Sequence, residues 1–249
     1  MATPFPSAWE EIIERNVPLY TYLPASLKQQ LHVHIQVLLA EKHFEGCGGL
    51  EMTDEIRVTI AAQASILLLN RRPRYYPKLD SILVYPSTFL SEDIQYLGDH
   101  TYIEGKSAHL GESWRRGILV LAWDTVKRGA LDVRDGQNVV FHEFAHQLDQ
   151  ENGAADGAPV LGRSSMYAPW ARILTKEYER LQSTVRRGVE TVMDEYGATN
   201  PAEFFAVATE AFFEKPRAMK WRHPELYEVL KSYYKLDPAQ WLGDSRKKS

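Results

Sequence analysis

The sequence predicts an α+β domain that is mostly helical and has a small sheet. Apolar residues recur at three- and four-residue spacing over several long segments, which is typical of amphipathic helices. Only two short segments are β-rich. The length of 249 residues allows one or two domains, and no internal repeat, low-complexity tract or long polar linker divides the chain. We therefore expect a single domain over residues 1–249, with helices at its N-terminal end.

Helices are expected first along the chain, followed by strands. The predicted elements of this first half are helices over residues 8–15, 26–42 and 53–69, then strands over residues 81–85 and 117–123. The hydroxyl of Thr53 can cap the third helix, whose first turn carries two acidic residues. Since Ile118 to Ala122 are all apolar, composition alone allows either a central strand or an edge strand there.

The helical period returns in the second half of the chain. Helical patterns cover residues 137–151 and 169–185 and follow Pro201 and Pro224. The last three patterns open with a proline, which the first helical position tolerates because its N–H has no helical partner. Residues 152–168 contain three glycines and many small residues, so we expect a mobile surface loop there.

The composition argues against two classes of partner, nucleic acids and membranes. The chain has 29 Lys and Arg against 33 Asp and Glu, and this net charge of −4 argues against a nucleic-acid partner. Its most apolar segment, residues 60–70, is interrupted by Gln63 and Ser65 and is shorter than the ~20 apolar residues that span a bilayer. No membrane partner is expected. The single cysteine and the acidic N-terminal segment predict a cytoplasmic location.

The motif with the clearest chemistry is HEFAH, at residues 142–146. His142 and His146 are four residues apart, so both imidazoles lie on one helical face and can bind one ion. Zinc accepts two histidines and a third protein ligand in catalytic sites, and Glu143 can act as the general base. The alternative is a core helix whose histidines only form hydrogen bonds. We favour zinc, because polar groups buried in such an apolar helix need partners.

The third ligand has to come from elsewhere in the chain. Asn152 and Asp149 stand where metzincins have their third ligand and glycine, which excludes that class. Asp149 is either a carboxylate that orients a ligand or an ordinary acidic residue near a helix end. Glu203 and Glu210 are seven residues apart on one helical face, and spacing leaves both open as ligands. Glu203 could also serve only the helix start, in a capping pair with Asn200.

Two motifs together resemble a known family. HEFAHQLD at residues 142–149 and Tyr196 followed by EFFA at residues 203–206 and EAFF at residues 210–213 resemble the Mlc titration factor A family, bacterial cytoplasmic zinc peptidases similar to the anthrax lethal factor catalytic domain. The resemblance also covers residues 111–114 and 118–123. It implies a zincin-like metallopeptidase fold with one zinc ion. It further implies that Glu203 is the third ligand, that Tyr196 faces the active site, and that Glu210 supports the site or packs, unless the two glutamates exchange roles.

Two functions follow from these observations. The first is a zinc-dependent peptidase, in which Glu143 activates water and Tyr196 stabilises the oxyanion; the resemblance adds an aminopeptidase-like preference. Resemblance also favours an exposed edge for the 117–123 strand, where a peptide substrate could add. The second function, implied by the same resemblance, is a binding protein that sequesters a transcriptional repressor of sugar uptake. An intact set of His142, Glu143, His146 and Glu203 argues that catalysis is retained.

Overall fold

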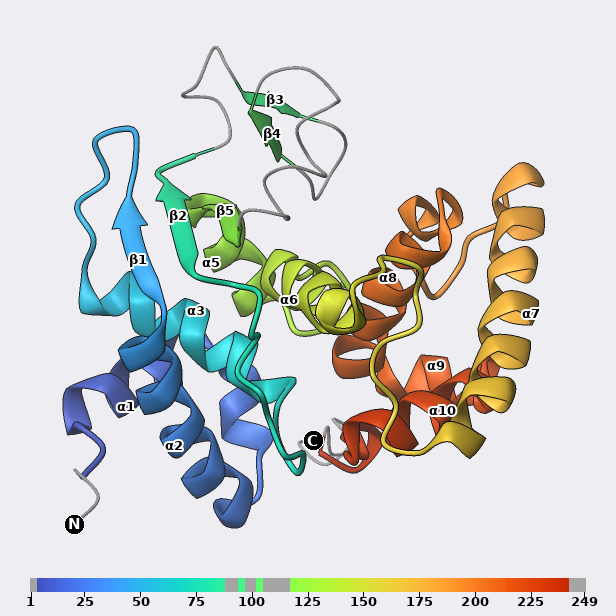
Figure 1. Ribbon diagram of the computed structural model, residues 1–249, viewed down its shortest axis with the longest axis horizontal. Coiled ribbons are helices and arrows are strands. Elements are labelled where there is room, and N and C mark those ends of the chain that lie inside the picture. The colour runs from blue at the N-terminus through green and yellow to red at the C-terminus, as the bar shows by residue number, and fades with distance from the viewer. Residues whose placement is uncertain (1–3, 88–93, 97–101, 105–116, 242–249) are drawn as a thin grey trace, which may run out of the picture.

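A computed structural model gives the fold for residues 4–87, 94–96, 102–104 and 117–241. It is mostly helical with a small sheet, which confirms the predicted α+β class (Figure 1). The α-helices are α1 (Ser7–Asn16), α2 (Ala25–Glu41), α3 (Asp54–Ile66), α5 (Trp123–Leu131), α6 (Val139–Asp149), α7 (Tyr167–Arg186), α8 (Pro201–Glu214), α9 (Pro216–Arg222) and α10 (Pro224–Tyr234). The strands are β1 (His43–Gly46), β2 (Ser81–Tyr85), β3 (Ile94–Tyr96), β4 (Tyr102–Glu104) and β5 (Ile118–Ala122).

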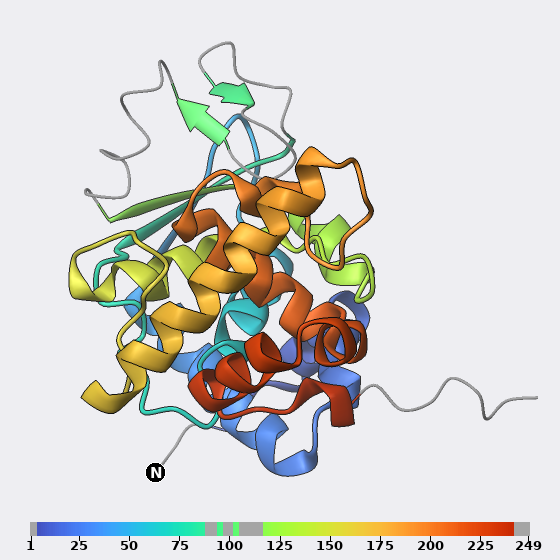
Figure 2. The same ribbon diagram turned by 90° about the vertical axis from the view of Figure 1, so that its right-hand side faces the viewer.

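Short 3-10 turns complete the described chain. They are η1 (Pro18–Tyr22), η2 (Gln150–Asn152), η3 (Ser164–Met166), η4 (Glu195–Ala198) and η5 (Pro238–Gln240). In Figure 1 the helices α1 to α3 lie at one end, the helices α7 to α10 lie at the other, and α6 lies between them. Figure 2, turned by 90°, shows α7 crossing the front of the molecule. One hydrophobic core extends from Ile13 to Leu236 and joins the two ends.

The N-terminal helices lie within a few residues of the predicted ranges. Both α1 and α2 pack against α3, which is buried along most of its length. Thr53 caps α3 as expected, since its hydroxyl accepts a hydrogen bond from the Ile56 N–H at 3.4 Å. The helix ends at Ile66, three residues before the predicted end. The next three leucines form a buried turn that leads to Asn70, whose φ of 56° is left-handed.

A parallel sheet has the order β1, β2, β5 in the described part of the chain. β5 pairs only with β2 there, which agrees with the expected edge position. The strands differ from the prediction in two ways. The predicted strand over residues 117–123 ends earlier, because Trp123 is the first residue of α5. The strand β1 was not predicted, because its four residues, HFEG, lack a β-rich pattern and depend on pairing with β2.

The antiparallel pair of β3 and β4 was also not predicted. The resemblance motif at residues 111–114 lies outside the described residues. Across the described chain, every helix is too short or too polar to cross a bilayer.

The C-terminal helices pack around α8. Pro201 and Pro224 are the first residues of α8 and α10, as predicted, and Pro216 opens α9 in the same way. α7 begins two residues before Pro169, so this proline stands in the first turn instead of at its first position. A proline fits there because the first-turn N–H groups have no helical partner. The helix α8 is buried at every residue except its first, and it packs against α6 and α7.

The segment between α6 and α7 is anchored at its middle, although we expected a mobile loop. The Asp149 Oδ2 atom accepts a hydrogen bond from the Gly157 N–H at 2.9 Å, and Trp170 Nε1 donates one to the Gly157 carbonyl oxygen at 3.0 Å. Gly157 has a φ of +77°, and a Cβ atom there would lie 2.4 Å from the Pro201 carbonyl oxygen. Only glycine allows this approach of the loop to α8.

Candidate metal centre

Helix α6 presents both histidines of the HEFAH motif from one face. It begins after Asn138, whose Oδ1 accepts a hydrogen bond from the Phe141 N–H at 3.0 Å. All eleven residues of α6 are buried, so the imidazoles of His142 and His146 are held in the protein interior. Their Nε2 atoms lie 3.2 Å apart.

Glu203 comes to the same point from the first turn of α8. Its Oε2 atom lies 3.0 Å from His142 Nε2 and 3.2 Å from His146 Nε2. Asn200 does cap this helix, since its Oδ1 accepts from the Glu203 N–H at 3.0 Å. The cap therefore uses the Glu203 backbone, while the Glu203 carboxylate is directed at the histidines. The capping role and a ligand role are compatible.

These three residues form a donor set that fits a metal ion. Among the described residues they are a group of His and Glu ligand atoms within 4.8 Å of one another, and all three residues are buried. Ligands at 2.0–2.1 Å from a tetrahedral zinc are about 3.3 Å apart. The observed separations of 3.0 to 3.2 Å are close to that value. Three lone-pair donors this close repel one another unless protons or a cation lie between them.

Glu210 bonds the other side of His142. Its Oε1 atom lies 2.8 Å from His142 Nδ1, and its Oε2 atom accepts from the Asn138 N–H at 2.5 Å. A proton on Nδ1 that is donated to this carboxylate leaves the Nε2 lone pair directed toward Glu203 and His146. The structure therefore brings Glu203, and not Glu210, to the Nε2 atoms.

Two residues near this network were missed by the sequence reasoning. Asn138 links the start of α6 to α8, because its Nδ2 atom donates to Glu214 Oε1 at 3.0 Å. An asparagine directly before a buried helical run is an N-cap signal that could have identified it. Glu214 continues the helical face of Glu203 and Glu210, so the same spacing rule could have found it.

Burial and neighbouring charges shift the pKa values of this group. Burial lowers the pKa of His142, but the charge of Glu210 and the hydrogen bond to Glu203 outweigh it, so the pKa lies well above its usual range. Burial raises the pKa of Glu203, but the hydrogen bonds with His142 and His146 lower it by more, so the net pKa lies below the usual range. The site thus stabilises a positive charge on the His142 imidazole and a negative charge on the Glu203 carboxylate.

The two residues predicted for catalysis lie beside the histidines. Glu143 is 5% exposed, and burial raises the pKa of its carboxyl above the usual value, which favours a proton acceptor working nearer neutral pH. Tyr196 lies in η4, where Asp194 Oδ1 accepts from the Tyr196 N–H at 2.8 Å. The half-buried Tyr196 ring is 6.1 Å from the His142 ring, measured between centroids.

Asp149 has a structural contact outside this group. Its Oδ2 atom anchors Gly157, as described above. Burial raises the pKa of Asp149 to about 6. Neither of the two predicted roles describes this contact, which fixes the loop after α6.

Comparison with known proteins agrees with this geometry. The family described as glucose-regulated metallo-peptidase M90 matches residues 1–235. An uncharacterized protein of Synechocystis sp. is 45% identical over 236 residues, which cover 94% of this chain and 86% of that protein. Mlc titration factor A of Yersinia pestis (strain Pestoides F) is 32% identical over 239 residues, with the same coverage of 94% and 86%.

The same protein of Yersinia pseudotuberculosis (serotype O:1b) gives identical values of 32%, 94% and 86%. The matches extend from the N-terminal helices through α8, and so include both motifs of the candidate centre. The chain belongs to the Mlc titration factor A family, the glucose-regulated metallo-peptidases M90.

Proposed function

We propose that this protein is a zinc-dependent peptidase, with one zinc ion held by His142, His146 and Glu203. The observation that carries the proposal is the convergence of two imidazole Nε2 atoms and one carboxylate oxygen at 3.0 to 3.2 Å, beside the buried Glu143. Membership of a metallopeptidase family supports it. We further propose a single zincin-like domain over residues 1–249, supported by the continuous core.

The roles of the protein groups follow from their positions. When bound, zinc supplies Lewis-acid chemistry, since it makes water more acidic and polarises a carbonyl oxygen. Glu143 accepts the proton of the attacking water and passes it to the departing amine. Tyr196 donates its phenolic hydrogen to the oxyanion that develops on the substrate carbonyl. Glu210 holds His142 in the tautomer whose Nε2 lone pair is directed at the ion.

The substrate in this proposal is a peptide, with the aminopeptidase-like preference that the resemblance implies. β5 supports it, because in the described residues one edge of this strand is unpaired and α6 packs close to the strand. A peptide can add to such an edge by main-chain hydrogen bonds, which accept many side chains.

The test is Glu143→Gln, which keeps the size of the side chain and removes the proton acceptor. We expect peptide hydrolysis to fall by ~10²–10⁴ while zinc content is retained, as loss of a general base typically does. Glu179→Gln, at an exposed position of α7, is the matched control and should leave hydrolysis unchanged. Equal turnover by the two variants would contradict the role of Glu143 and assign the activity to another site or to a contaminant.

A second function rests on the relatives. The two Yersinia relatives carry the name Mlc titration factor A, and the resemblance implies binding of a transcriptional repressor of sugar uptake. We propose that this chain binds such a repressor as an alternative main function, with peptidase activity secondary. Binding of the purified repressor by Glu143→Gln would separate this function from catalysis. Absence of binding by both the wild-type protein and the variant would remove it.

A further inference from the structure

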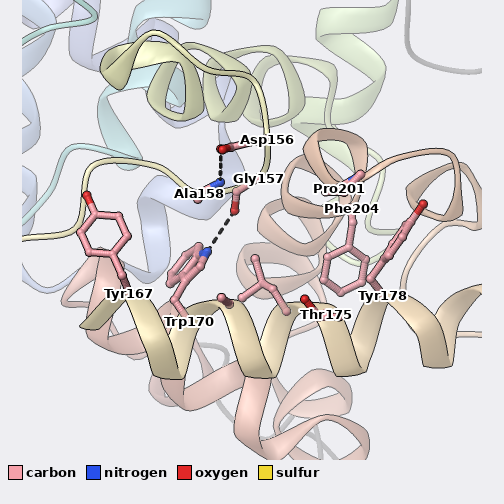
Figure 3. Close-up of a pocket in the computed structure, with 11 residues that line it drawn as sticks. Asp156, Gly157, Ala158, Tyr167, Trp170, Thr175, Tyr178, Pro201 and Phe204 are labelled. Carbon is pink, nitrogen blue, oxygen red and sulfur yellow. Dashed lines mark hydrogen bonds between the residues drawn. The ribbon is translucent and has the colours of Figure 1, made fainter. Parts of the chain in front are cut away.

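A cavity of about 330 Å³ lies between α7, the first turn of α8 and the loop that joins α6 to α7 and is anchored at Gly157 (Figure 3). Its walls include the aromatic rings of Tyr167, Trp170, Tyr178 and Phe204, together with the side chain of Leu174. Ala171 and Thr175, one turn apart on α7, line it from solvent-exposed positions. The cavity is therefore reachable from solvent and is built largely of apolar surface.

Three covalent or hydrogen-bonded links connect the cavity with the candidate metal centre. Phe204 follows Glu203 directly in α8. Tyr178 donates its hydroxyl hydrogen to the Ala198 carbonyl oxygen at 3.2 Å, two residues after Tyr196. The Gly157 N–H donates a hydrogen bond to Asp149, and Asp149 lies one turn after His146 in α6. The cavity is thus enclosed by continuations of the segments that carry the proposed ligands and Tyr196.

The chemistry of the walls selects an apolar ligand. The polar ends of the aromatic side chains already have backbone partners: Trp170 Nε1 donates to Gly157, Tyr178 donates to Ala198, and the Tyr167 hydroxyl accepts from the Leu161 N–H at 3.2 Å. Asp156 Oδ1 likewise accepts from the Ala158 N–H at 3.1 Å. Apart from the Tyr167 hydroxyl hydrogen, the Asp156 carboxylate and the Thr175 hydroxyl, the walls offer ring faces and aliphatic surface to a ligand. This surface favours aromatic or long aliphatic groups.

We propose that this cavity receives the apolar side chain of a peptide-substrate residue close to the bond that is cleaved. The inference rests on the proposed peptidase function and deepens it, because it names the substrate class as peptides with a bulky apolar residue. The volume is near the lower end of the ~300–1,000 Å³ range of ligand pockets, which suits one side chain better than a whole cofactor. Trp170 and Phe204 form the base of the cavity, since both are almost completely buried.

The test fills the cavity from its exposed wall. Ala171→Trp and Thr175→Trp place a large ring at the cavity from solvent-exposed helical positions, so the core is left intact. Arg172→Trp, at the exposed neighbouring position that does not line the cavity, is the matched control. Each protein is assayed with peptides that differ only in Phe or Ala at successive positions around the cleaved bond.

We expect the wild-type protein to prefer Phe at one position by about tenfold or more in kcat/KM. Both cavity-filling variants should lose this preference while retaining hydrolysis of the Ala peptide and zinc content. Arg172→Trp should keep the preference. A wild-type protein without any Phe preference, or an unchanged preference in both filled variants, would overturn the inference while leaving the peptidase proposal standing.

A second measurement separates this inference from failure of the peptidase proposal itself. If the wild-type protein hydrolyses none of the peptides, binding of N-acetyl-phenylalaninamide and N-acetyl-alaninamide to the metal-free protein is compared by NMR titration. Tighter binding of the phenylalanine compound, lost in Ala171→Trp and kept in Arg172→Trp, would support the side-chain cavity. Equal or absent binding of both compounds would reject it.

Discussion

Replacement of Glu210 by Gln tests how the two buried glutamates divide their roles around His142. The Gln side chain keeps the shape and an oxygen that can accept from His142 Nδ1, but it removes the negative charge. Glu210 is fully buried and lies 2.8 Å from Nδ1, so this charge acts on the imidazole with little screening by solvent. Loss of such an outer partner typically lowers metal affinity by about 10–100-fold.

This range corresponds to about 1.4–2.7 kcal/mol of binding free energy. Glu203→Gln should have a larger effect, because it alters a proposed ligand atom at 3.0 Å from His142 Nε2. Glu214→Gln is the matched control. It lies on the same face of α8 and bonds Asn138, and burial raises the pKa of Glu214 well above its usual value, so the Gln variant resembles the protonated carboxyl.

The assay is a competition titration of zinc against a chelator, with thermal unfolding of each metal-free protein as a check on folding. We expect zinc affinity to decrease in the order wild type and Glu214→Gln, then Glu210→Gln, then Glu203→Gln. A Glu203→Gln variant that binds zinc normally, together with complete loss in Glu210→Gln, would show that the two glutamates exchange roles and would refute the assignment.

Two further predictions concern stability. In urea unfolding, Gly157→Ala should destabilise the fold by about 2–4 kcal/mol more than Gly188→Ala, because the new Cβ would displace the loop and break its two hydrogen bonds. Gly188 is the control, since it also has a positive φ of +64° but a Cβ there would meet open space. Equal losses of unfolding free energy in the two variants would contradict the close approach of Gly157 to Pro201. Burial raises the pKa of Glu177, but the hydrogen bond and charge of His223 lower it by more than burial raises it. The net pKa of Glu177 therefore lies below the usual range. The pair therefore stabilises the fold above the unfolded pKa of about 4.3 and loses this contribution as the pH falls through the folded pKa. Glu177→Ala should lower the unfolding free energy at neutral pH by about 1–3 kcal/mol and flatten its decline in acid, and an unchanged acid limb would contradict this account.

The parts of the fold that follow local rules could be predicted from the sequence. Helical spacing, the Thr53 cap and the prolines of α8 and α10 depend on neighbouring residues alone, and the structure agrees with them. β1 and the β3 and β4 pair depend on partners far along the chain, so no local pattern indicated them. The loop after α6 is composed of small residues, yet long-range bonds from Asp149 and Trp170 anchor it.

The candidate centre shows the same division. The spacing of His142 and His146 on one helix predicts their common direction, and the structure has both Nε2 atoms 3.2 Å apart. Spacing within α8 could not distinguish Glu203 from Glu210, because residues seven apart share a helical face. The packing of α8 on α6 is what brings one carboxylate to Nε2 and the other to Nδ1.

The most direct measurement is an anomalous-scattering map at the zinc edge, from crystals of protein purified without added metal. The account predicts one peak at ~2.0–2.2 Å from His142 Nε2, His146 Nε2 and a Glu203 carboxylate oxygen. A map without a peak at this position, or a peak coordinated by Glu210 in place of Glu203, would contradict it.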